Sequence, residues 1–344
     1  MTTTAEPQTS RATAVWLAGV AAVVLAMVVV GGATRVTGSG LSITEWRPIS
    51  GAIPPLSHAD WARVFDLYRA TPQYRLTNQG MSLGQFQSIF WWEWVHRLLG
   101  RLLGVVFLIP FLVLLVRRRL PRRLTWRCVG LFALGGLQGA VGWWMVKSGL
   151  ENRTSVAPER LATHLGLALL LFAALVWTAL EAWSGPRRRS GQVEPGWIRA
   201  SGLFLAAVYL QCLLGALVAG NHAGLVNADW PLMAGRLFPS DYWQGSVWAT
   251  LAHGAAAVQF NHRLWAYGLL AAGLAMAAAS LRSGGEAVRP ITAAIAVLLL
   301  AQVGLGIAAL LLTVPLPLAM LHQFTAVTIL GAATILAWRA RRMK

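Results

Sequence analysis

The stretch GGATRVTGSGLSITEWRPISGAIPP at residues 31–55 returns later in the chain as GALVAGNHAGLVNADWPLMAGRLFP at residues 215–239. The two stretches align without a gap, and identical residues stand at six of the aligned positions: Gly31/Gly215, Gly40/Gly224, Leu41/Leu225, Trp46/Trp230, Gly51/Gly235 and Pro55/Pro239. The similarity continues downstream, where His96-Arg97 returns as His262-Arg263 and His164 returns as His322. The chain is therefore predicted to contain two copies of one structural unit.

The composition is that of an integral membrane protein. Hydrophobic residues make up 56% of the 344 residues and charged residues only 12%, and the mean hydropathy is +0.57. The chain also holds 17 Trp residues, a side chain that gathers at membrane–water interfaces. Apolar runs of about 20 residues recur along the whole chain, which is the length needed to cross a bilayer core.

The net charge of +17 raises the alternative of nucleic-acid binding, but the placement of the charge argues against it. Basic residues cluster in short segments between apolar runs, as the positive-inside rule describes for membrane proteins. These clusters are Arg117 to Arg119 with Arg122, Arg123 and Arg127; Arg187 to Arg189; Arg282 and Arg289; and Arg339, Arg341, Arg342 and Lys344. We expect lipid, and no nucleic acid, as the surrounding of this chain.

Eight membrane-spanning helices are predicted, and no strands. They are expected at residues 13–34, 86–116, 126–147, 160–183, 198–219, 248–281, 290–312 and 318–339. The basic loops follow the second, fourth and sixth helices, so both termini are expected in the cytoplasm of a bacterium and the chain in its inner (cytoplasmic) membrane. The short polar N-terminus favours this location over an organelle.

The predicted architecture is two four-helix bundles, residues 1–184 and 185–344. Each repeat holds an even number of spans, so the bundles have the same orientation and are related by a pseudo-two-fold axis along the membrane normal. The long loops 35–85 and 220–247 face outward. Within the first loop, residues 57–69 carry apolar side chains at helical spacing and predict an amphipathic helix on the outer surface.

Four of the seven histidines stand at repeat-equivalent places in the first turns of even-numbered helices: His96, His164, His262 and His322. Polar groups inside membrane helices are costly and usually functional. Each half offers two imidazoles from two helices, whereas a zinc site would need further ligands. Haem iron needs only two axial ligands, so a bis-histidine haem site is predicted in each half. His58, His222 and His253 are expected to be ordinary surface or loop residues.

Three arginines lie where they could bind haem propionates near the outer interface. Arg97 and Arg263 directly follow ligand histidines, and Arg35 ends the first helix. The alternative is that these side chains reach outward to lipid phosphates. The sequence leaves both interpretations open.

The two halves differ one turn before the first histidine of each pair, where Glu93 is replaced by Gln259. Glu93 and His96 are three residues apart and share a helix face. A carboxylate in one half only indicates that this half performs chemistry while the other holds a fixed cofactor. The alternative is that Glu93 lies at a wet interface and pairs with Arg97 or Arg101.

Several long motifs together resemble the haem A synthase family. They are NQGMSLGQFQSIF followed directly by WWEWVHRLLGRLLG, then LGGLQGAVGWWMVKSGL, THLGLAL, FNHRLWAYGLL and LHQFTAV. The resemblance runs from Gly31 to the last helix. The outer loop lacks the cysteine pair of one branch of the family, so the chain resembles the other branch, typical of proteobacteria and mitochondria.

The resemblance implies an oxidoreductase that converts the C8 methyl of haem O to the formyl group of haem A, for cytochrome oxidase. Two successive hydroxylations would give a gem-diol that loses water. It further implies that His262 and His322 ligate a haem B cofactor. His96 and His164 would ligate the substrate haem, with Glu93 near its methyl group.

Partners and competing functions follow from the same comparison. A haem O synthase and cytochrome oxidase assembly factors are natural neighbours, whereas the electron donor and the oligomeric state, a homo-oligomer included, are left open. One alternative is a di-haem membrane electron carrier without substrate turnover. A second is a transporter built on parallel repeats, against which the gathering of ionisable residues towards the outer side argues.

Overall fold

The computed structural model describes residues 11–185, 195–283 and 285–342. Within these ranges, eight helices are long and apolar enough to cross a membrane, which confirms the predicted number of spans. They are α1 (Arg11–Val36), α4 (Leu83–Val116), α5 (Arg122–Glu151), α6 (Pro158–Ser184), α7 (Pro195–Gly220), α8 (Ala255–Ser283), α9 (Gly285–Leu311) and α10 (Leu316–Arg342). Part of the predicted boundary between the halves, residues 186–194, lies outside the described residues.

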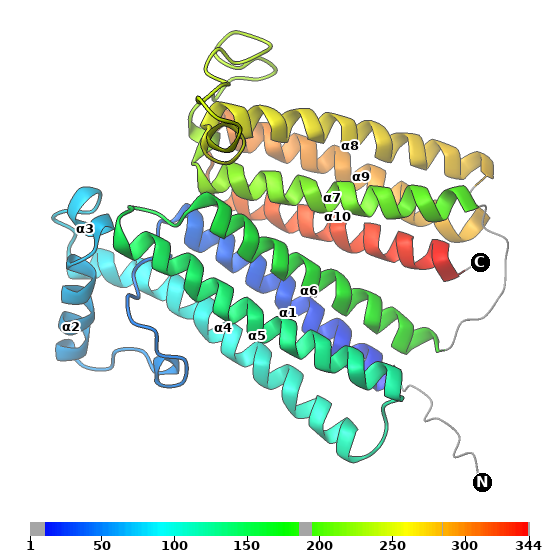
Figure 1. Ribbon diagram of the computed structural model, residues 1–344, viewed down its shortest axis with the longest axis horizontal. Coiled ribbons are helices and arrows are strands. Elements are labelled where there is room, and N and C mark those ends of the chain that lie inside the picture. The colour runs from blue at the N-terminus through cyan, green and yellow to red at the C-terminus, as the bar shows by residue number, and fades with distance from the viewer. Residues whose placement is uncertain (1–10, 186–194, 284, 343–344) are drawn as a thin grey trace.

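The spanning helices form two neighbouring groups, with α1, α4, α5 and α6 in one and α7 to α10 in the other (Figure 1). In the first group, α1 and α5 each pack against both α4 and α6, so α4 and α6 lie across the diagonal. In the second group, α7 and α9 each pack against both α8 and α10. The groups meet through α1, α6, α7 and α10, so each group presents two helices to the other.

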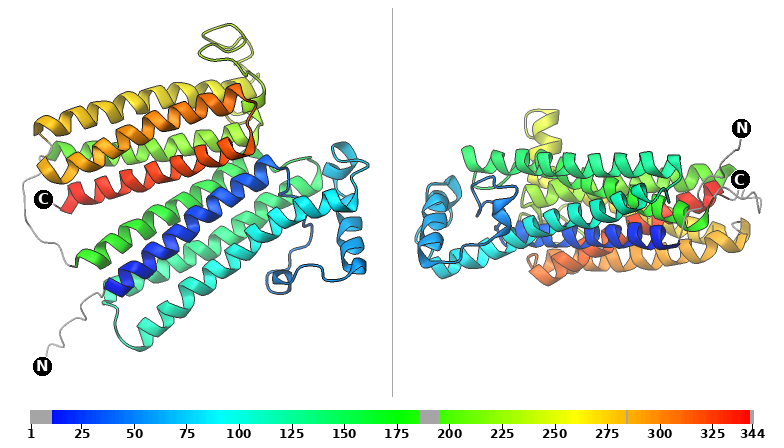
Figure 2. Two further views of the ribbon diagram at one scale, coloured as in Figure 1. Left: turned by 180° about the vertical axis from the view of Figure 1, so that it is seen from behind. Right: turned by 90° about the horizontal axis from the view of Figure 1, so that it is seen from below.

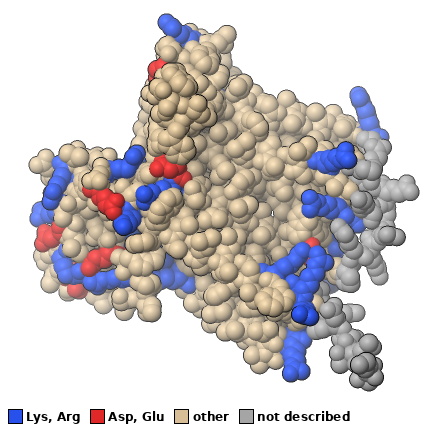
Figure 3. All heavy atoms as spheres, viewed as in Figure 1, with Lys and Arg blue, Asp and Glu red and all other residues tan. Residues whose placement is uncertain are grey.

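The loops and the charges divide between the two ends of the helices. The long connections from α1 to α4 and from α7 to α8 protrude at the same end, opposite the ends of the described chain (Figures 1 and 2). At that end basic and acidic side chains mix, whereas basic side chains predominate at the other (Figure 3). The last turn of α10, with Arg339, Arg341 and Arg342, belongs to this basic end.

The start of the helix predicted at 248–281 is wrong. The chain instead forms a π-helical turn over Ala249–His253, and α8 begins after Gly254. A Cβ on Gly254 would lie 2.8 Å from the carbonyl oxygen of Thr250. Only glycine lets the backbone pass this close, and the break therefore falls there.

The amphipathic segment of the first outer loop forms α2 (His58–Arg69), as predicted from its spacing. Ser57 and Asp60 form a capping box at its start. Phe65 and Tyr68 stack on Phe86 at the start of α4, with ring centroids 4.9 and 5.2 Å apart. This cluster packs α2 onto the outer extension of α4 and so fixes the loop above the first helix group.

Three short helices in the outer loops have too few residues to show a sequence period. They are α3 (Pro72–Leu76) and the 3-10 turns η1 (Ser50–Ala52) and η2 (Ala223–Leu225). The sequence analysis did not predict them.

Replacing Phe86 by Ala is expected to destabilise the outer loop. The ring is fully buried, and loss of a buried Phe costs about 3–5 kcal/mol. Thermal unfolding of the purified protein in detergent should show a clearly lower midpoint for Phe86→Ala than for the control Leu56→Ala, because Leu56 is 80% exposed. Equal midpoints for the two variants would contradict the role of this cluster.

Candidate functional site

The four repeat-equivalent histidines lie in pairs across the diagonals of the two helix groups. His96 on α4 and His164 on α6 belong to one pair, and His262 on α8 and His322 on α10 to the other. Each pair takes one histidine from each of the two diagonal helices of its group. The structure thus brings together the residues that the sequence grouped as candidate ligands.

Each imidazole lies against a glycine of a flanking helix. We call these four residues the histidine-facing glycines: Gly31 on α1, Gly142 on α5, Gly215 on α7 and Gly306 on α9. A Cβ added to them would lie 3.0 Å from Cε1 of His96, 2.8 Å from that of His164, 3.1 Å from that of His262 and 3.0 Å from that of His322. Because no side chain separates ring from backbone, the flanking helix sets the position of each ring.

The donor set of each pair fits an iron porphyrin. Nδ1 of His96, His164 and His322 is buried without a hydrogen-bond partner, so these three ring nitrogens lack the partners that buried polar atoms normally have. In the described ranges no three His, Cys, Asp or Glu residues gather as a metal cage would require. Haem iron takes four ligands from its macrocycle and needs only two from the protein, which matches one pair of imidazoles in each group.

Three of the four histidines also touch a glutamine, which the sequence analysis missed. Each glutamine comes from the same flanking helix as the histidine-facing glycine and stands four residues before it. The amide Nε2 atoms are 2.9 Å from the carbonyl oxygen of His164 (Gln138), 3.1 Å from that of His262 (Gln211) and 3.2 Å from Nε2 of His322 (Gln302). Extending the repeat alignment by four residues towards the N-terminus would have found Gln211, which aligns with Met27.

Glu93 is buried, with 3% of its surface exposed, which argues against the alternative that it lies at a wet interface. Its pairing with Arg97 is confirmed: Nη2 of Arg97 lies 2.6 Å from Oε1 and Nε lies 3.0 Å from it. The other carboxylate oxygen accepts hydrogen bonds from the hydroxyl of Ser42 (2.7 Å) and the backbone N–H of Ile43 (2.8 Å). Glu93 therefore ties α4 to the outer loop, and its negative charge is matched by an adjacent guanidinium.

The second half keeps the same loop contact without the carboxylate. Arg263 donates to the carbonyl oxygen of Asn227 (3.1 Å), just as Arg97 donates to that of Ile43 (2.7 Å). Asn227 and Ile43 are aligned in the repeat. Gln259, buried like Glu93, donates to the same oxygen of Asn227 (3.0 Å). The two arginines therefore hold the outer loops in place in both halves.

Arg35 connects the two halves instead of facing lipid. Its Nη2 donates to the carbonyl oxygen of Gly220 (3.1 Å) and lies 2.7 Å from Nε2 of His222. Burial, and secondarily the Arg35 charge, lower the pKa of His222, so this ring is neutral and accepts the hydrogen bond. His222 was expected to be an ordinary loop residue, and it is instead part of this contact.

The remaining histidines lie outside the pairs. His58 is exposed, as expected. His253, in the π-helical turn, has its Nε2 3.8 Å from a carboxylate oxygen of Glu159 at the start of α6. It therefore forms a second contact between the halves on the outer side.

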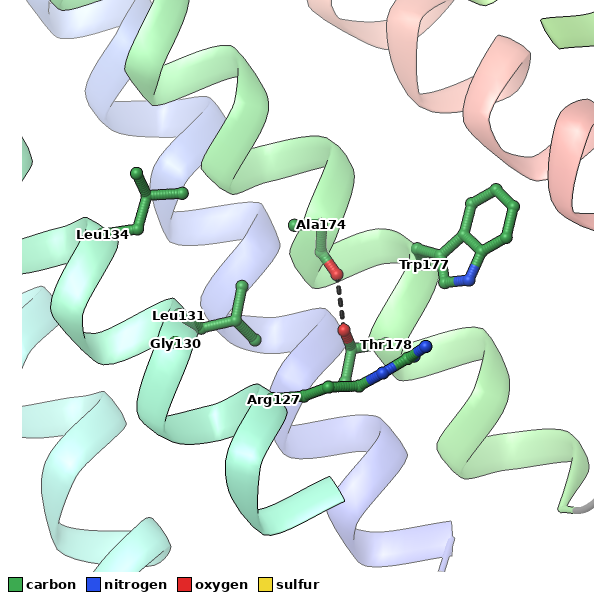
Figure 4. A pocket seen from close by; sticks show the side chains of 7 residues that line it. All are labelled: Arg127, Gly130, Leu131, Leu134, Ala174, Trp177 and Thr178. Atoms are coloured by element: carbon green, nitrogen blue, oxygen red, sulfur yellow. Dashed lines mark hydrogen bonds between the residues drawn. The ribbon is translucent and has the colours of Figure 1, made fainter. Parts of the chain in front are cut away.

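Two cavities have no paired histidine among the residues that line them. One of about 330 Å³ lies between α5 and α6, where Thr178 donates to the carbonyl oxygen of Ala174 at 2.6 Å (Figure 4). Its wall residues on α6 lie well past His164 along the helix, so this cavity is not part of the site. The other, of about 280 Å³, lies under the first outer loop and is lined by Trp94, Arg97 and Arg101 among others.

Comparison with known proteins gives matches along almost the whole chain. The model of the family described as "Cytochrome oxidase assembly protein" matches residues 14–334. A heme A synthase of Caulobacter vibrioides is 54% identical over 346 residues, covering 99% of this chain and 100% of the relative. Those of Caulobacter sp. strain K31 and Parvibaculum lavamentivorans are 56% and 47% identical and cover 99% and 97% of this chain, and 100% and 94% of the relatives.

Adding a methyl group at a histidine-facing glycine is expected to displace the adjacent ring. The Cβ of Gly306→Ala would meet Cε1 of His322, whereas nothing lies within 4 Å of a Cβ at Gly304, two residues earlier on the same helix. Gly306→Ala should therefore lose bound haem, and Gly304→Ala should keep it. Haem per protein, measured as the pyridine haemochrome after purification from cells that supply haem, tests this, and equal content in both variants would contradict it.

Proposed function

Since this chain belongs to the haem A synthase family, we propose how its two halves divide the work of that enzyme. The protein is an oxidoreductase that acts on haem O, and a multi-pass protein of a bacterial inner membrane. Its reaction converts the C8 methyl of haem O into the formyl group of haem A. The relatives' names do not favour the two alternatives considered from the sequence, a di-haem carrier and a transporter.

The N-terminal half, residues 1–184, binds the substrate haem O between His96 and His164. The C-terminal half, residues 185–344, binds haem B between His262 and His322. A bound haem B supplies one-electron redox chemistry to the protein. The observation that carries this proposal is the pairing of half-buried imidazoles on the diagonal helices of both groups, each ring resting on a glycine.

The pseudo-two-fold axis along the membrane normal is part of the same proposal. It is supported by the packing, because the contact of α1 with α10 has its counterpart in the contact of α7 with α6. We place both termini in the cytoplasm because basic side chains predominate at that end (Figure 3). The paired histidines then lie towards the outer side of the membrane, below the two long loops.

Glu93 gives the N-terminal half its chemistry in this proposal. It is the carboxylate one turn from His96, and Gln259 in the other half cannot ionise. The guanidinium of Arg97 and two further donors hold Glu93 in one orientation. There it holds a proton or stabilises positive charge that develops at the methyl carbon during oxidation.

The arginines are proposed to bind haem propionates, and Arg35 is the best placed for it. Its Nε is buried without a hydrogen-bond partner. Arg97 and Arg263 already donate to loop carbonyls, so in them propionate binding adds to a structural role. Haem O from a haem O synthase and delivery to cytochrome oxidase assembly factors complete the proposed setting.

Alanine variants of the four histidines are expected to separate the two haem sites. His262→Ala and His322→Ala should lose the resident haem B, whereas His96→Ala and His164→Ala should keep it and fail to convert haem O. Pigment extraction and chromatography of haems from membranes that also contain a haem O source measures both effects. His58→Ala, at an exposed position, is the control. If both His262→Ala and His322→Ala retain haem B, the assignment of haem B to the C-terminal half is refuted.

Glu93→Gln reproduces the residue of the second half and tests the carboxylate. General acid–base groups contribute about 100-fold or more, so conversion of haem O should fall by at least this factor while haem binding remains. Glu45→Gln removes an exposed carboxylate of the same loop and should leave conversion unchanged. Full conversion by Glu93→Gln would remove Glu93 from the mechanism.

A further inference from the structure

One arrangement around the histidines occurs in three copies and is altered in the fourth. The sequences QGAVG (138–142), QCLLG (211–215) and QVGLG (302–306) each place a glutamine one helical turn before a histidine-facing glycine. The same place in α1 reads MVVVG (27–31), with Met27 where the others have glutamine. His96 is therefore the only one of the four whose flanking helix offers a thioether in place of an amide.

The amides of Gln138 and Gln211 contact both the backbone and the ring of their histidines, and the amide of Gln302 contacts the ring of His322. Gln211 shows this most fully, since its Nε2 lies 3.1 Å from the carbonyl oxygen of His262 and 3.1 Å from ring atom Nδ1. Gln138 donates to the carbonyl oxygen of His164 and lies 3.4 Å from its Nε2. An amide side chain in this place links the histidine to the flanking helix that carries the glutamine.

The other end of each amide is also available to the ring. Oε1 of Gln138, Gln211 and Gln302 is buried without a hydrogen-bond partner. When one imidazole nitrogen binds iron, the other carries a proton and needs an acceptor, and that acceptor fixes the ring and raises its basicity. A buried amide oxygen without a partner, beside the ring, is such an acceptor.

Met27 can do neither of these things for His96. A thioether donates no hydrogen bond and is a weak acceptor. The methyl carbon of Met27 instead reaches α4, where it lies 3.5 Å from the position of a Cβ on Gly100, one turn after His96. Nδ1 of His96 is buried without a partner. The His96 ring thus has packing contacts and a backbone hydrogen bond with Met27, but no hydrogen bond from a side-chain amide.

Resting on the proposed function, we propose that Gln138, Gln211 and Gln302 are positioning residues that fix three of the ligand imidazoles. Met27 supplies no amide to the fourth, His96, which makes this ring the most easily reoriented of the four. The C-terminal half then holds its haem with two fixed ligands, as suits a resident cofactor. The N-terminal half has one fixed ligand and one exchangeable ligand, as suits a site that must accept haem O and release haem A.

The test exchanges the two side chains in both directions in the full-length protein. Gln211→Met removes an amide in the C-terminal half, and Met27→Gln supplies one in the N-terminal half. The control Gln323→Met makes the same chemical change next to His322, at a glutamine that packs against Gly32 of α1. The readouts are the rate at which haem passes to added apomyoglobin and the midpoint potential of the bound haem.

Loss of a hydrogen-bonded partner of a metal ligand lowers metal affinity about 10–100-fold. Gln211→Met should therefore release haem B at least about tenfold faster than the control and raise its midpoint potential, because a less basic imidazole stabilises ferric iron less. Met27→Gln should slow the release of haem from the N-terminal half by a comparable factor. If Gln211→Met does not fold, Met27→Gln alone still tests the inference.

Two different results separate this inference from the proposed function. Release rates and potentials of Gln211→Met and Met27→Gln that equal those of Gln323→Met would overturn the inference, while haem loss in His262→Ala still supports the haem site. Haem that stays bound in His262→Ala would overturn the proposed function itself.

Discussion

The contact between a half-buried imidazole and a glycine of the flanking helix is the constraint on which this structure depends. An ionisable side chain in an apolar helix is costly unless it has a partner. Here four such side chains recur at equivalent places, and a glycine of the flanking helix makes room for each. The helices that carry the histidines are the diagonal ones, so each group contributes one pair of imidazoles. Two facing imidazoles inside an apolar helix bundle form a natural haem site.

The outer loops act with the helices to complete each site. In both halves the arginine that follows a candidate ligand donates to a loop carbonyl at an aligned position, Ile43 or Asn227. The loop and the ligand helix are therefore coupled on the outer side. In the N-terminal half the buried carboxylate of Glu93 also takes part in the contact between loop and ligand helix. In the C-terminal half the amide of Gln259 takes its place. Duplication thus preserved the framework, while single substitutions at Glu93 and Met27 distinguish the two halves.

Much of the fold could be predicted from the sequence because its signals are strong and local. Apolar runs gave the eight spans, and the internal repeat gave the grouping of the histidines. The break in the helix at Gly254 was not predicted, because it depends on the close approach of one carbonyl oxygen. The loop partner of Glu93 and the partner of Arg35 were not predicted, because they lie far away in the sequence. The glutamines were within reach of the repeat alignment, but their meaning appeared only when they were found against the rings.

The central claim is that each pair of imidazoles shares one iron. Electron paramagnetic resonance of the purified, oxidised protein loaded with haem tests it most directly, because the spectrum reports the axial ligands of ferric haem. Our account predicts low-spin signals typical of two imidazole ligands, and in the absence of haem O these should come from the C-terminal half alone. A high-spin signal with a single protein ligand, or a low-spin signal that survives the joint loss of His262 and His322, would contradict it.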